Sequence, residues 1–337
     1  MGTVGIKALR RIQLVKEVTP GTQITTATAK LVMGGEFENT QEFYRPDDLD
    51  NGILESYTRS YLTGEQAKIA LNGDANYEQL AYLLGMCIIG GIGGGSPTDS
   101  VYTRTFLPNL TSANNPDTYT MQYGDDVEAW IAGFCYATDL ELTAALGEKA
   151  VMKAKANLVG QSFLPSTFTG AISLPTTLTP VIVGSGQLYI DSSWANLGNT
   201  HISNSLVELS YKITPGIQPI KYIDGNIYFS DRAEAKRHVE MSVTFALNST
   251  TAAYFAANYN TSPQPLQFIR CKFTGPLIGA TAHAELDLDC AAVIDKWPAL
   301  SDRQGQDTVK LNLLSQLDPT SQHAWQVILK NGVATLP

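Results

Sequence analysis

Three carboxylates at alternate positions late in the chain are the residues whose spacing best suits chemistry. Glu285, Asp287 and Asp289 alternate with apolar residues, so in a β-strand they would share one face. Such a face could bind a divalent cation, supply a catalytic carboxylate pair, line an acidic channel, or pair with basic residues on neighbouring strands. The lysines considered for such pairing are Lys149, Lys153, Lys155 and Lys310.

A shorter ladder of the same design lies near the middle of the chain. Asp139 and Glu141 alternate with Leu140 and Leu142, so a strand here would also have one acidic and one apolar face. No aromatic residues typical of a sugar-binding cleft surround either ladder. We therefore treat both ladders together as candidates for lining a channel, namely Asp139, Glu141, Glu285, Asp287 and Asp289.

Other catalytic and ligand-binding patterns are absent from the sequence. There is no G-x-S-x-G, no H-E-x-x-H and no calcium-loop pattern, and no two of the four histidines have metal-ligand spacing. The glycine run at residues 90–95 is not followed by Lys-Ser or Lys-Thr, as a phosphate loop requires. The sequence predicts no catalytic, cofactor or metal site, and a protein that is not an enzyme.

The composition favours a folded protein that buries surface against copies of itself. Of the 337 residues 44% are hydrophobic, whereas only 16% are charged, well below the roughly 25% of ordinary globular chains. The net charge of −9 argues against a sequence-independent grip on nucleic acid, which needs clustered lysine and arginine. It is compatible with a passage through which nucleic acid slides, because negative walls repel phosphates.

The cysteines and the apolar runs indicate where the protein folds. Cys87, Cys135, Cys271 and Cys290 form no C-x-x-C pair, and we interpret them as small core residues in a reducing compartment, with one disulfide as the alternative. Residues 1–18 hold no apolar run of signal-peptide length, and the most apolar stretch, residues 80–95, is too short to cross a bilayer. We expect a soluble protein folded in a cytoplasm.

Short matches in the same order suggest an internal repeat with a period of about 175 residues. Residues 13–15 match 187–189, residues 30–32 match 205–207, and residues 69–73 match 245–249. Further on, Asp139–Leu142 matches Glu285–Leu288 at a smaller spacing, which extra loop at residues 90–115 of the first copy would explain. The sequence predicts two similar domains, residues 2–163 and 180–337, joined by a Pro/Thr/Ser-rich linker at residues 164–179.

Alternation of apolar and polar residues dominates both copies and predicts strands. Residues 139–143, 151–159, 206–213, 239–247, 284–290 and 308–314 all show it. Short helices are expected only at residues 77–86 and 251–259. Each copy is therefore expected to be mainly β, a β-sandwich or partial barrel with a short flanking helix.

Two polar segments, residues 36–60 and 211–230, interrupt the alternation at corresponding places. Each contains a tight-turn dipeptide, Asn51-Gly52 or Asp224-Gly225, so each is expected to form a long hairpin. Aromatic residues on an exposed hairpin favour contact with another subunit, although they could instead fold back on their own sheet. The contact candidates are Phe43, Tyr44, Arg45, Asp47, Asp48, Tyr57, Tyr222 and Tyr228.

Several of these segments, in their order, resemble the tail tube proteins of long-tailed bacteriophages. The segments are residues 7–22 with their Gly-Thr turn, the helix at 77–86, the strand at 118–125, Leu188-Tyr-Ile-Asp, and residues 209–216. The resemblance covers most of the chain and implies β-sandwiches with a flanking helix and a long loop. It further implies that inner sheets of neighbouring subunits join around a lumen and that rings stack through the loops, which would place the contact candidates between rings.

The resemblance also carries expectations about assembly. Single-domain members form hexameric rings, so a tandem member is expected to form trimers with pseudo-sixfold symmetry. Expected partners are further copies of the chain and the tape measure, tail terminator and baseplate or tail tip proteins. DNA would pass through the lumen unbound, with no cofactor and no membrane, in a virion tail assembled in the host cytoplasm. The alternatives are another β-rich virion decoration or host-binding module, and a hydrolase using the acidic ladder.

Overall fold

The protein is mainly β, as the alternating pattern predicted. The structure is a computed structural model that describes residues 5–47, 57, 59–89, 101–147, 150–175, 177–203, 205–249, 251–252, 261–296 and 300–334. Its strands are β1 (Arg11–Lys16), β2 (Ala29–Leu31), β3 (Gly34–Tyr44), β4 (Tyr61–Asp74), β5 (Tyr102–Phe106), β6 (Tyr119–Gly124), β7 (Ala129–Ala145), β8 (Lys153–Gly160), β9 (Leu164–Ser166), β10 (Gly186–Asp191), β11 (His201–Ile202), β12 (Leu206–Thr214), β13 (Ile217–Ile220), β14 (Asp231–Glu234), β15 (His238–Ala246), β16 (Gln267–Leu277), β17 (His283–Lys296), β18 (Leu300–Arg303), β19 (Gln306–Ser315) and β20 (Trp325–Asn331). The described helices are α1 (Leu80–Cys87) and the 3-10 turns η1 (Lys7–Leu9), η2 (Val183–Ser185) and η3 (Trp194–Asn196).

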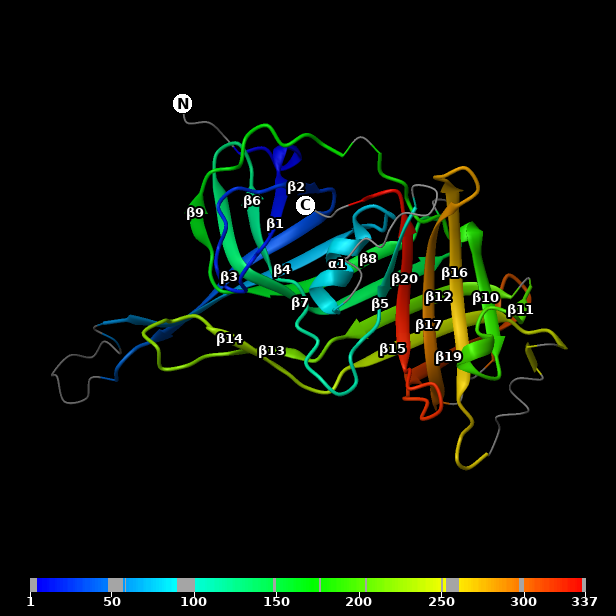
Figure 1. Cartoon of the computed structure of the whole chain (residues 1–337). Coiled ribbons are helices and arrows are strands. Elements are labelled where there is room, and N and C mark those ends of the chain that lie inside the picture. Colours follow the sequence, from blue (N-terminus) through cyan, green and yellow to red (C-terminus); the bar gives the residue numbers. More distant parts are fainter. Residues whose placement is uncertain are drawn as a thin grey trace.

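A long antiparallel sheet runs through the middle of the molecule and contains strands from both ends of the sequence. Its order is β3-β4-β8-β7-β12-β15-β19, and the end of β17 together with β18 follows beyond β19. We call it the central sheet. The pair β7–β12 joins strands from before and after the predicted linker, so one continuous sheet unites the two halves of the chain (Figure 1).

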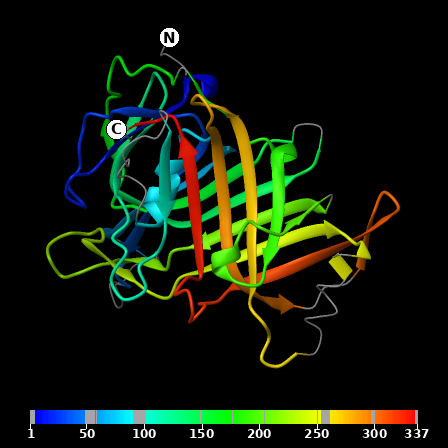
Figure 2. The same ribbon diagram turned by 45° about the vertical axis from the view of Figure 1, so that its right-hand side comes forward.

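Two smaller sheets flank the central sheet. One has the order β2-β1-β6-β7-β9, and the other β11-β10-β16-β17-β20-β5. Figure 2 shows β20, β17, β16 and β10 of the second sheet side by side. The long strands β7 and β17 each belong to one flanking sheet near their start and to the central sheet near their end. They therefore hold the layers together.

One buried apolar cluster fills the space between these sheets and includes residues of both halves. All eight residues of α1 are buried, so this helix is apolar on every side and lies inside the molecule. It confirms the helix expected at residues 77–86, though the structure begins it at Leu80. Of the second expected helix, residues 253–259 lie outside the described part of the chain. The two halves thus share a core, which two independently packed domains would not.

Strand pairing in the second half repeats that of the first. The described pairings that correspond are β1–β2 and β10–β11, β1–β6 and β10–β16, β3–β4 and β12–β15, β4–β8 and β15–β19, β6–β7 and β16–β17, β7–β8 and β17–β19, and β7–β9 and β17–β20. The match of β9 with β20 is notable, because β9 lies in the segment that was expected to be linker. Extra pairing by β5 distinguishes the halves, since this first-half strand extends the second-half sheet through β20.

The correspondence extends to single residues in the central sheet. Both β7–β8 and β17–β19 contain a register shift, between Ala137 and Asp139 in one and between Ile294 and Lys296 in the other. Following the partners outward from these shifts gives two matching rows across four strands. The rows are Ala137–Leu158–Ile69–Phe37 in the first half and Ile294–Leu313–Met241–Tyr211 in the second.

These rows change the alignment of the acidic ladders. Asp139 follows the register shift in β7, whereas Glu285 lies near the start of β17, before its shift. The sequence match between the two ladders is therefore displaced along an equivalent strand. The displacement is physically simple, because both stretches alternate between a buried apolar face and an opposite polar face.

Candidate functional site

The five candidate channel residues fall on two different sheets. Asp139 and Glu141 lie on the polar face of the central sheet, opposite the fully buried Leu140 and Leu142. Glu285, Asp287 and Asp289 lie where β17 pairs with β16 and β20, in a flanking sheet. The structure therefore does not bring the two ladders together on one surface.

The polar face of the central sheet carries mixed charge. Glu141 is paired across the strands with Lys155 on β8 and Lys212 on β12, and its Oε1 accepts a hydrogen bond of 2.9 Å from Ser210 Oγ. Both carboxylate oxygens of Asp139 lie 2.9 Å from Asn157 Nδ2. The face is thus hydrophilic and carries charges of both signs, which differs from the acidic wall expected from the two ladders together.

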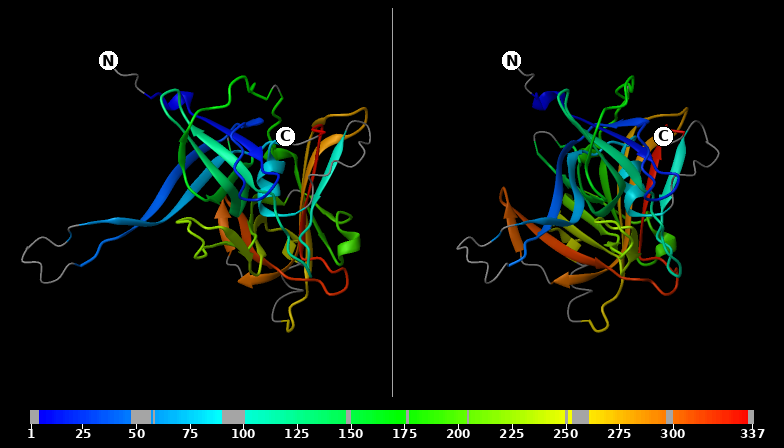
Figure 3. Two further views of the ribbon diagram at one scale, coloured as in Figure 1. Left: turned by 60° about the vertical axis from the view of Figure 1, so that its left-hand side comes forward. Right: turned by 90° about the vertical axis from the view of Figure 1, so that its left-hand side faces the viewer.

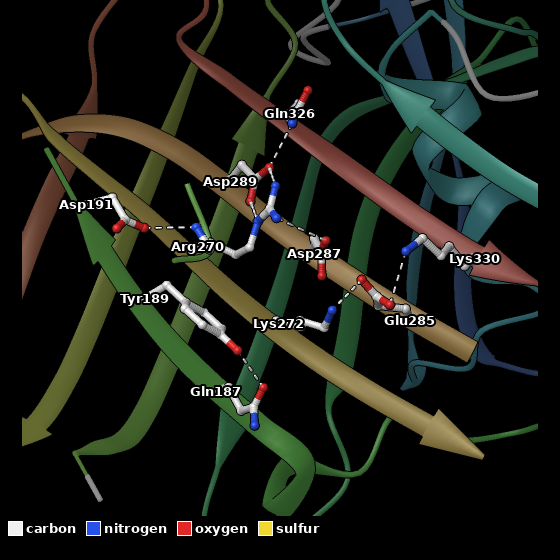
Figure 4. A network of polar contacts seen from close by, with 11 residues as sticks. Gln187, Tyr189, Asp191, Arg270, Lys272, Glu285, Asp287, Asp289, Gln326 and Lys330 are labelled. Atoms are coloured by element: carbon white, nitrogen blue, oxygen red, sulfur yellow. Dashed lines mark hydrogen bonds and ion pairs between the residues drawn. The ribbon is translucent and has the colours of Figure 1, made fainter. Parts of the chain in front are cut away.

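The ladder on β17 is a compact ion-pair cluster (Figure 4). Asp289, 0% exposed, receives two hydrogen bonds of 2.7 Å from Arg270 on β16 and one of 2.8 Å from Gln326 on β20. Glu285 lies 2.8 Å from Lys272 Nζ and 3.1 Å from Lys330 Nζ. Cross-strand pairing was one of the open alternatives for this ladder, and it is the arrangement found. The partners differ from the lysines considered, three of which lie in the first half or on β19; Lys149 is outside the described residues.

Asp287 is the member of this cluster without a close partner. Its Oδ1 is buried with no hydrogen bond, and its Oδ2 lies 3.7 Å from Arg270 Nη1. Burial, then repulsion by Glu285, raises the pKa of Asp287 to about 7, against the opposing attraction of Arg270. For Glu285 burial alone would raise the pKa, but the hydrogen bond to Lys272 and the charge of Lys330 outweigh it, and its pKa is lowered.

Replacement of Asp287 by Asn is expected to stabilise the protein above neutral pH. The pKa of this carboxyl is 3.8 in the unfolded chain and about 7 in the folded protein. Its ionisation therefore does not lower the free energy of unfolding below pH 4, but lowers it increasingly between pH 4 and 7. We expect Asp287→Asn to raise the free energy of unfolding by about 2 kcal/mol at pH 8 and to have little effect near pH 4. Urea unfolding of both proteins at the two pH values measures this.

Glu285→Gln provides the control of opposite sign. The lowered pKa of the Glu285 carboxyl stabilises the folded protein at pH values above its unfolded pKa of 4.5. This contribution is lost as the pH falls through the folded pKa. Glu285→Gln should therefore destabilise by about 1 kcal/mol at pH 8. An Asp287→Asn effect that does not change with pH would show that this carboxyl is not the group under strain.

The carboxylates of the β17 ladder are buried or held by neighbouring cations. Within the described ranges no three His, Cys, Asp or Glu side chains are arranged to hold a metal ion. Asp287 and Asp289 are buried in the sheet, where a polymeric substrate would not reach them. His283 Nδ1 donates a hydrogen bond to Gly275 O over 2.9 Å and makes no described contact with Glu285. The four cysteines are free and buried, and burial raises the pKa of each thiol.

The first of the two predicted hairpins projects from the body of the molecule. β3 and β4 pair along their length, and Figure 3 shows their far ends well away from the sheets. We call this hairpin the arm. Phe43 is 49% exposed, Tyr44 and Tyr57 are 59% exposed, and Arg45 and Asp47 are exposed as well. Asp48 and the Asn51-Gly52 dipeptide lie outside the described residues.

The second predicted hairpin, β13–β14, folds back onto the first half. Phe229 and Ile217 are buried against Phe134 and Tyr136 of β7, with ring centroids of Phe229 and Phe134 5.3 Å apart. The Gln161 amide donates to Phe229 O over 3.2 Å. Tyr222 remains exposed and Tyr228 is half-buried. The two predicted hairpins therefore differ. The first projects from the body of the molecule, and the second packs on its own chain.

The sequence reasoning missed the residues that receive this hairpin. Phe134 and Tyr136 lie in an apolar stretch that predicts only a buried strand, and nothing in it indicates a docking site. Phe134 has a φ of 54°, in the left-handed region that a phenylalanine rarely adopts. Arg232 of β14 stacks on both rings, with its Cζ 5.9 Å from the Phe134 centroid and 5.8 Å from that of Tyr136.

No described helix has the length and apolar character needed to span a bilayer. No protein-family model matches the chain. No curated protein matches it either.

Proposed function

We propose that this chain is a structural virion protein, the major tail tube subunit, which assembles through the edges of its central sheet. The two halves arise in this proposal from a tandem duplication, and each supplies one repeat of a ring. Three copies then give six repeats with pseudo-sixfold symmetry. Stacked rings form the conduit through which DNA leaves the virion, in a tail assembled in the host cytoplasm.

The observation that carries the proposal is the β7–β12 junction. It joins one half to the other by a ladder in which Thr143 pairs with Ser210. Among the described residues β3, the counterpart of β12, pairs only with β4, and β18 pairs only with β19. The chain thus contains one completed junction and the two edges needed to repeat it with further copies.

The matching rows give the register of the repeated junction. Thr143 pairs with Lys153 of β8, and Ser301 pairs with Thr308 of β19. Lys153 and Thr308 precede the members of the two rows on these strands, Leu158 and Leu313, by the same number of residues. Ser301 therefore corresponds to Thr143. Glu36 corresponds to Ser210, because each directly precedes the β3 or β12 member of its row. Glu36 of one copy should then pair with Ser301 of the next.

Closure of such a ring would place the polar face of the central sheet on the lumen. Asp139 and Glu141 would line it, while the β17 cluster would lie in an outer layer. A face on which carboxylates stand among the lysines, in a net-negative chain, would hold phosphates weakly, so DNA could slide past it. The tape measure, tail terminator and baseplate or tail tip proteins are the further partners of this proposal.

A cysteine pair tests the edge contact. In Glu36→Cys/Ser301→Cys, both new thiols are exposed in the single chain and should meet between copies. Oxidation should give a covalent ladder that ends at a closed ring, read by non-reducing gel and by mass measurement. Electron microscopy of the same sample should show rings or tubes.

Each single variant is the matched control. The contact is head-to-tail, so Glu36→Cys alone or Ser301→Cys alone cannot propagate a chain of cross-links. Monomers under all assembly conditions, with no ladder in the double variant, would overturn the proposed function.

A further inference from the structure

The β13–β14 hairpin makes a contact that occurs once among the described residues. Its Ile217 and Phe229 are 4% and 0% exposed because they pack on Phe134 and Tyr136 of the other half. Val159, the β8 partner of Tyr136, packs against the same cluster. The hairpin also meets the base of the arm, where Glu65 N donates to Ile227 O over 3.0 Å. This contact therefore accompanies the β7–β12 junction.

The arm carries the counterparts of the two anchoring residues. Phe43 corresponds to Ile217, because it follows Phe37 by as many residues as Ile217 follows Tyr211. Tyr57 corresponds to Phe229, because it precedes Ile69 by as many residues as Phe229 precedes Met241. Both counterparts are large and aromatic, yet both are about half exposed in the single chain. Exposed aromatics on a projecting hairpin are typical anchors of an interface.

The second half presents the counterpart of the receiving surface. Val293 and Leu314 pair across β17 and β19 as Tyr136 and Val159 pair across β7 and β8. Leu314 is 37% exposed and Val293 is half-buried, so apolar surface remains uncovered here. Gln316 N donates to Ala291 O over 2.8 Å, as Gln161 N does to Gly133 O over 3.0 Å.

Gln316 strengthens the match because its counterpart has a specific role. Gln161 holds the docked hairpin through its side-chain amide, which donates to Phe229 O. Gln316 is exposed and lies three residues after Leu313, as Gln161 lies three after Leu158. An amide is thus available at the position where the second receiving surface would need a donor to a docked backbone.

We infer that the arm of a second copy docks on this surface, with Phe43 and Tyr57 against Val293 and Leu314 and with Gln316 donating to Tyr57 O. The inference rests on the proposed function and names the partner surface of the arm. Within one chain, the β13–β14 hairpin docks on the half whose β7 pairs with the neighbouring β12. By the same rule, the arm that docks on the second half belongs to the copy whose β3 pairs with β18. Phe43 and Tyr57 then join neighbours within one ring, whereas the sequence expectation placed them between rings.

Cross-linking at the arm tests the inference in the full-length chain. Tyr57→Cys/Val293→Cys should form disulfide-linked species up to the size of one ring and no larger. The matched control is Tyr44→Cys/Val293→Cys, because Tyr44 follows Phe43 in β3 and therefore points to the opposite face. We expect about tenfold more cross-linked product from the Tyr57 pair than from the control. The native cysteines are buried and should not compete.

The edge pair Glu36→Cys/Ser301→Cys, run in parallel, separates the two proposals. Edge cross-links without Tyr57–Val293 cross-links would overturn the docking inference and leave ring assembly standing. Tyr57–Val293 products that grow beyond one ring would also overturn it, because the arm would then link successive rings. If neither pair cross-links, ring assembly itself fails. A further variant, Gln316→Ala, should weaken assembly without changing the unfolding of the single chain.

Discussion

Replacing Arg270 with Met is expected to lower the free energy of unfolding by about 3–5 kcal/mol, because it leaves a buried carboxylate without its cation. Asp289 is fully buried and takes two charge-assisted hydrogen bonds from the guanidinium. The same hydrogen bonds raise the pKa of Arg270 above its usual value, so the guanidinium keeps its charge. After the change only Gln326 would still donate to Asp289. Urea unfolding at neutral pH measures the loss.

Two further variants separate the ion pair from packing. Lys272→Met removes a neighbouring, partly exposed cation of the same strand and should cost about 1 kcal/mol or less. Arg270→Met combined with Asp289→Leu removes both charges, and most of the lost stability should return, because an apolar pair satisfies this site without desolvating ions. If Arg270→Met costs no more than Lys272→Met, Asp289 does not depend on this partner.

The strands were predictable because their chemistry is local. Each of the six alternating segments lies on a strand of the structure, and the Asp224-Gly225 turn lies between β13 and β14. Period-two alternation follows from a sheet with one apolar and one wet face, so it is written in consecutive residues. The same reasoning found Leu140 and Leu142 on the buried side of β7 and Leu286 and Leu288 on that of β17.

What surrounds a strand was not predictable in the same way. Alternation tells which face of β17 is polar but not that Arg270 and Lys272, rather than Lys310, stand beside it. Nor does it tell that β7 and β17 pass from one sheet to another, which displaced the match between the two ladders. Residues 30–32 and 205–207 show the same limit, since Leu31 lies in β2 but Leu206 begins β12, the counterpart of β3.

Buried polar residues carried the weakest sequence signal of all. Glu17 lies between Lys16 and Val18, in a stretch that reads as an exposed strand end. It is instead 3% exposed, and its carboxylate organises three separate segments. Three of its four donors come from residues more than a hundred positions away, so no local pattern could have identified it.

Replacing Glu17 with Ala is expected to cost about 3–4 kcal/mol, because four donors lose their acceptor together. Gly21 N and Thr118 Oγ1 donate to Oε2 over 2.9 and 2.8 Å, and Thr120 Oγ1 and Phe134 N donate to Oε1 over 2.9 and 2.7 Å. The bond to Phe134 N also holds that residue at its positive φ. Thermal and urea unfolding should both register the loss.

The effect should spread to the hairpin that rests on Phe134. With the Phe134 backbone released, the ring no longer has a fixed place beside Phe229, so β13–β14 should become more open to limited proteolysis than the rest of the chain. Glu17→Gln keeps one oxygen for two donors and should lie between wild type and Glu17→Ala. Glu128→Ala, in the exposed turn before β7, is the matched control and should cost about 0.5 kcal/mol or less. Equal cleavage of β13–β14 in Glu17→Ala and Glu128→Ala would show that Glu17 does not support this surface.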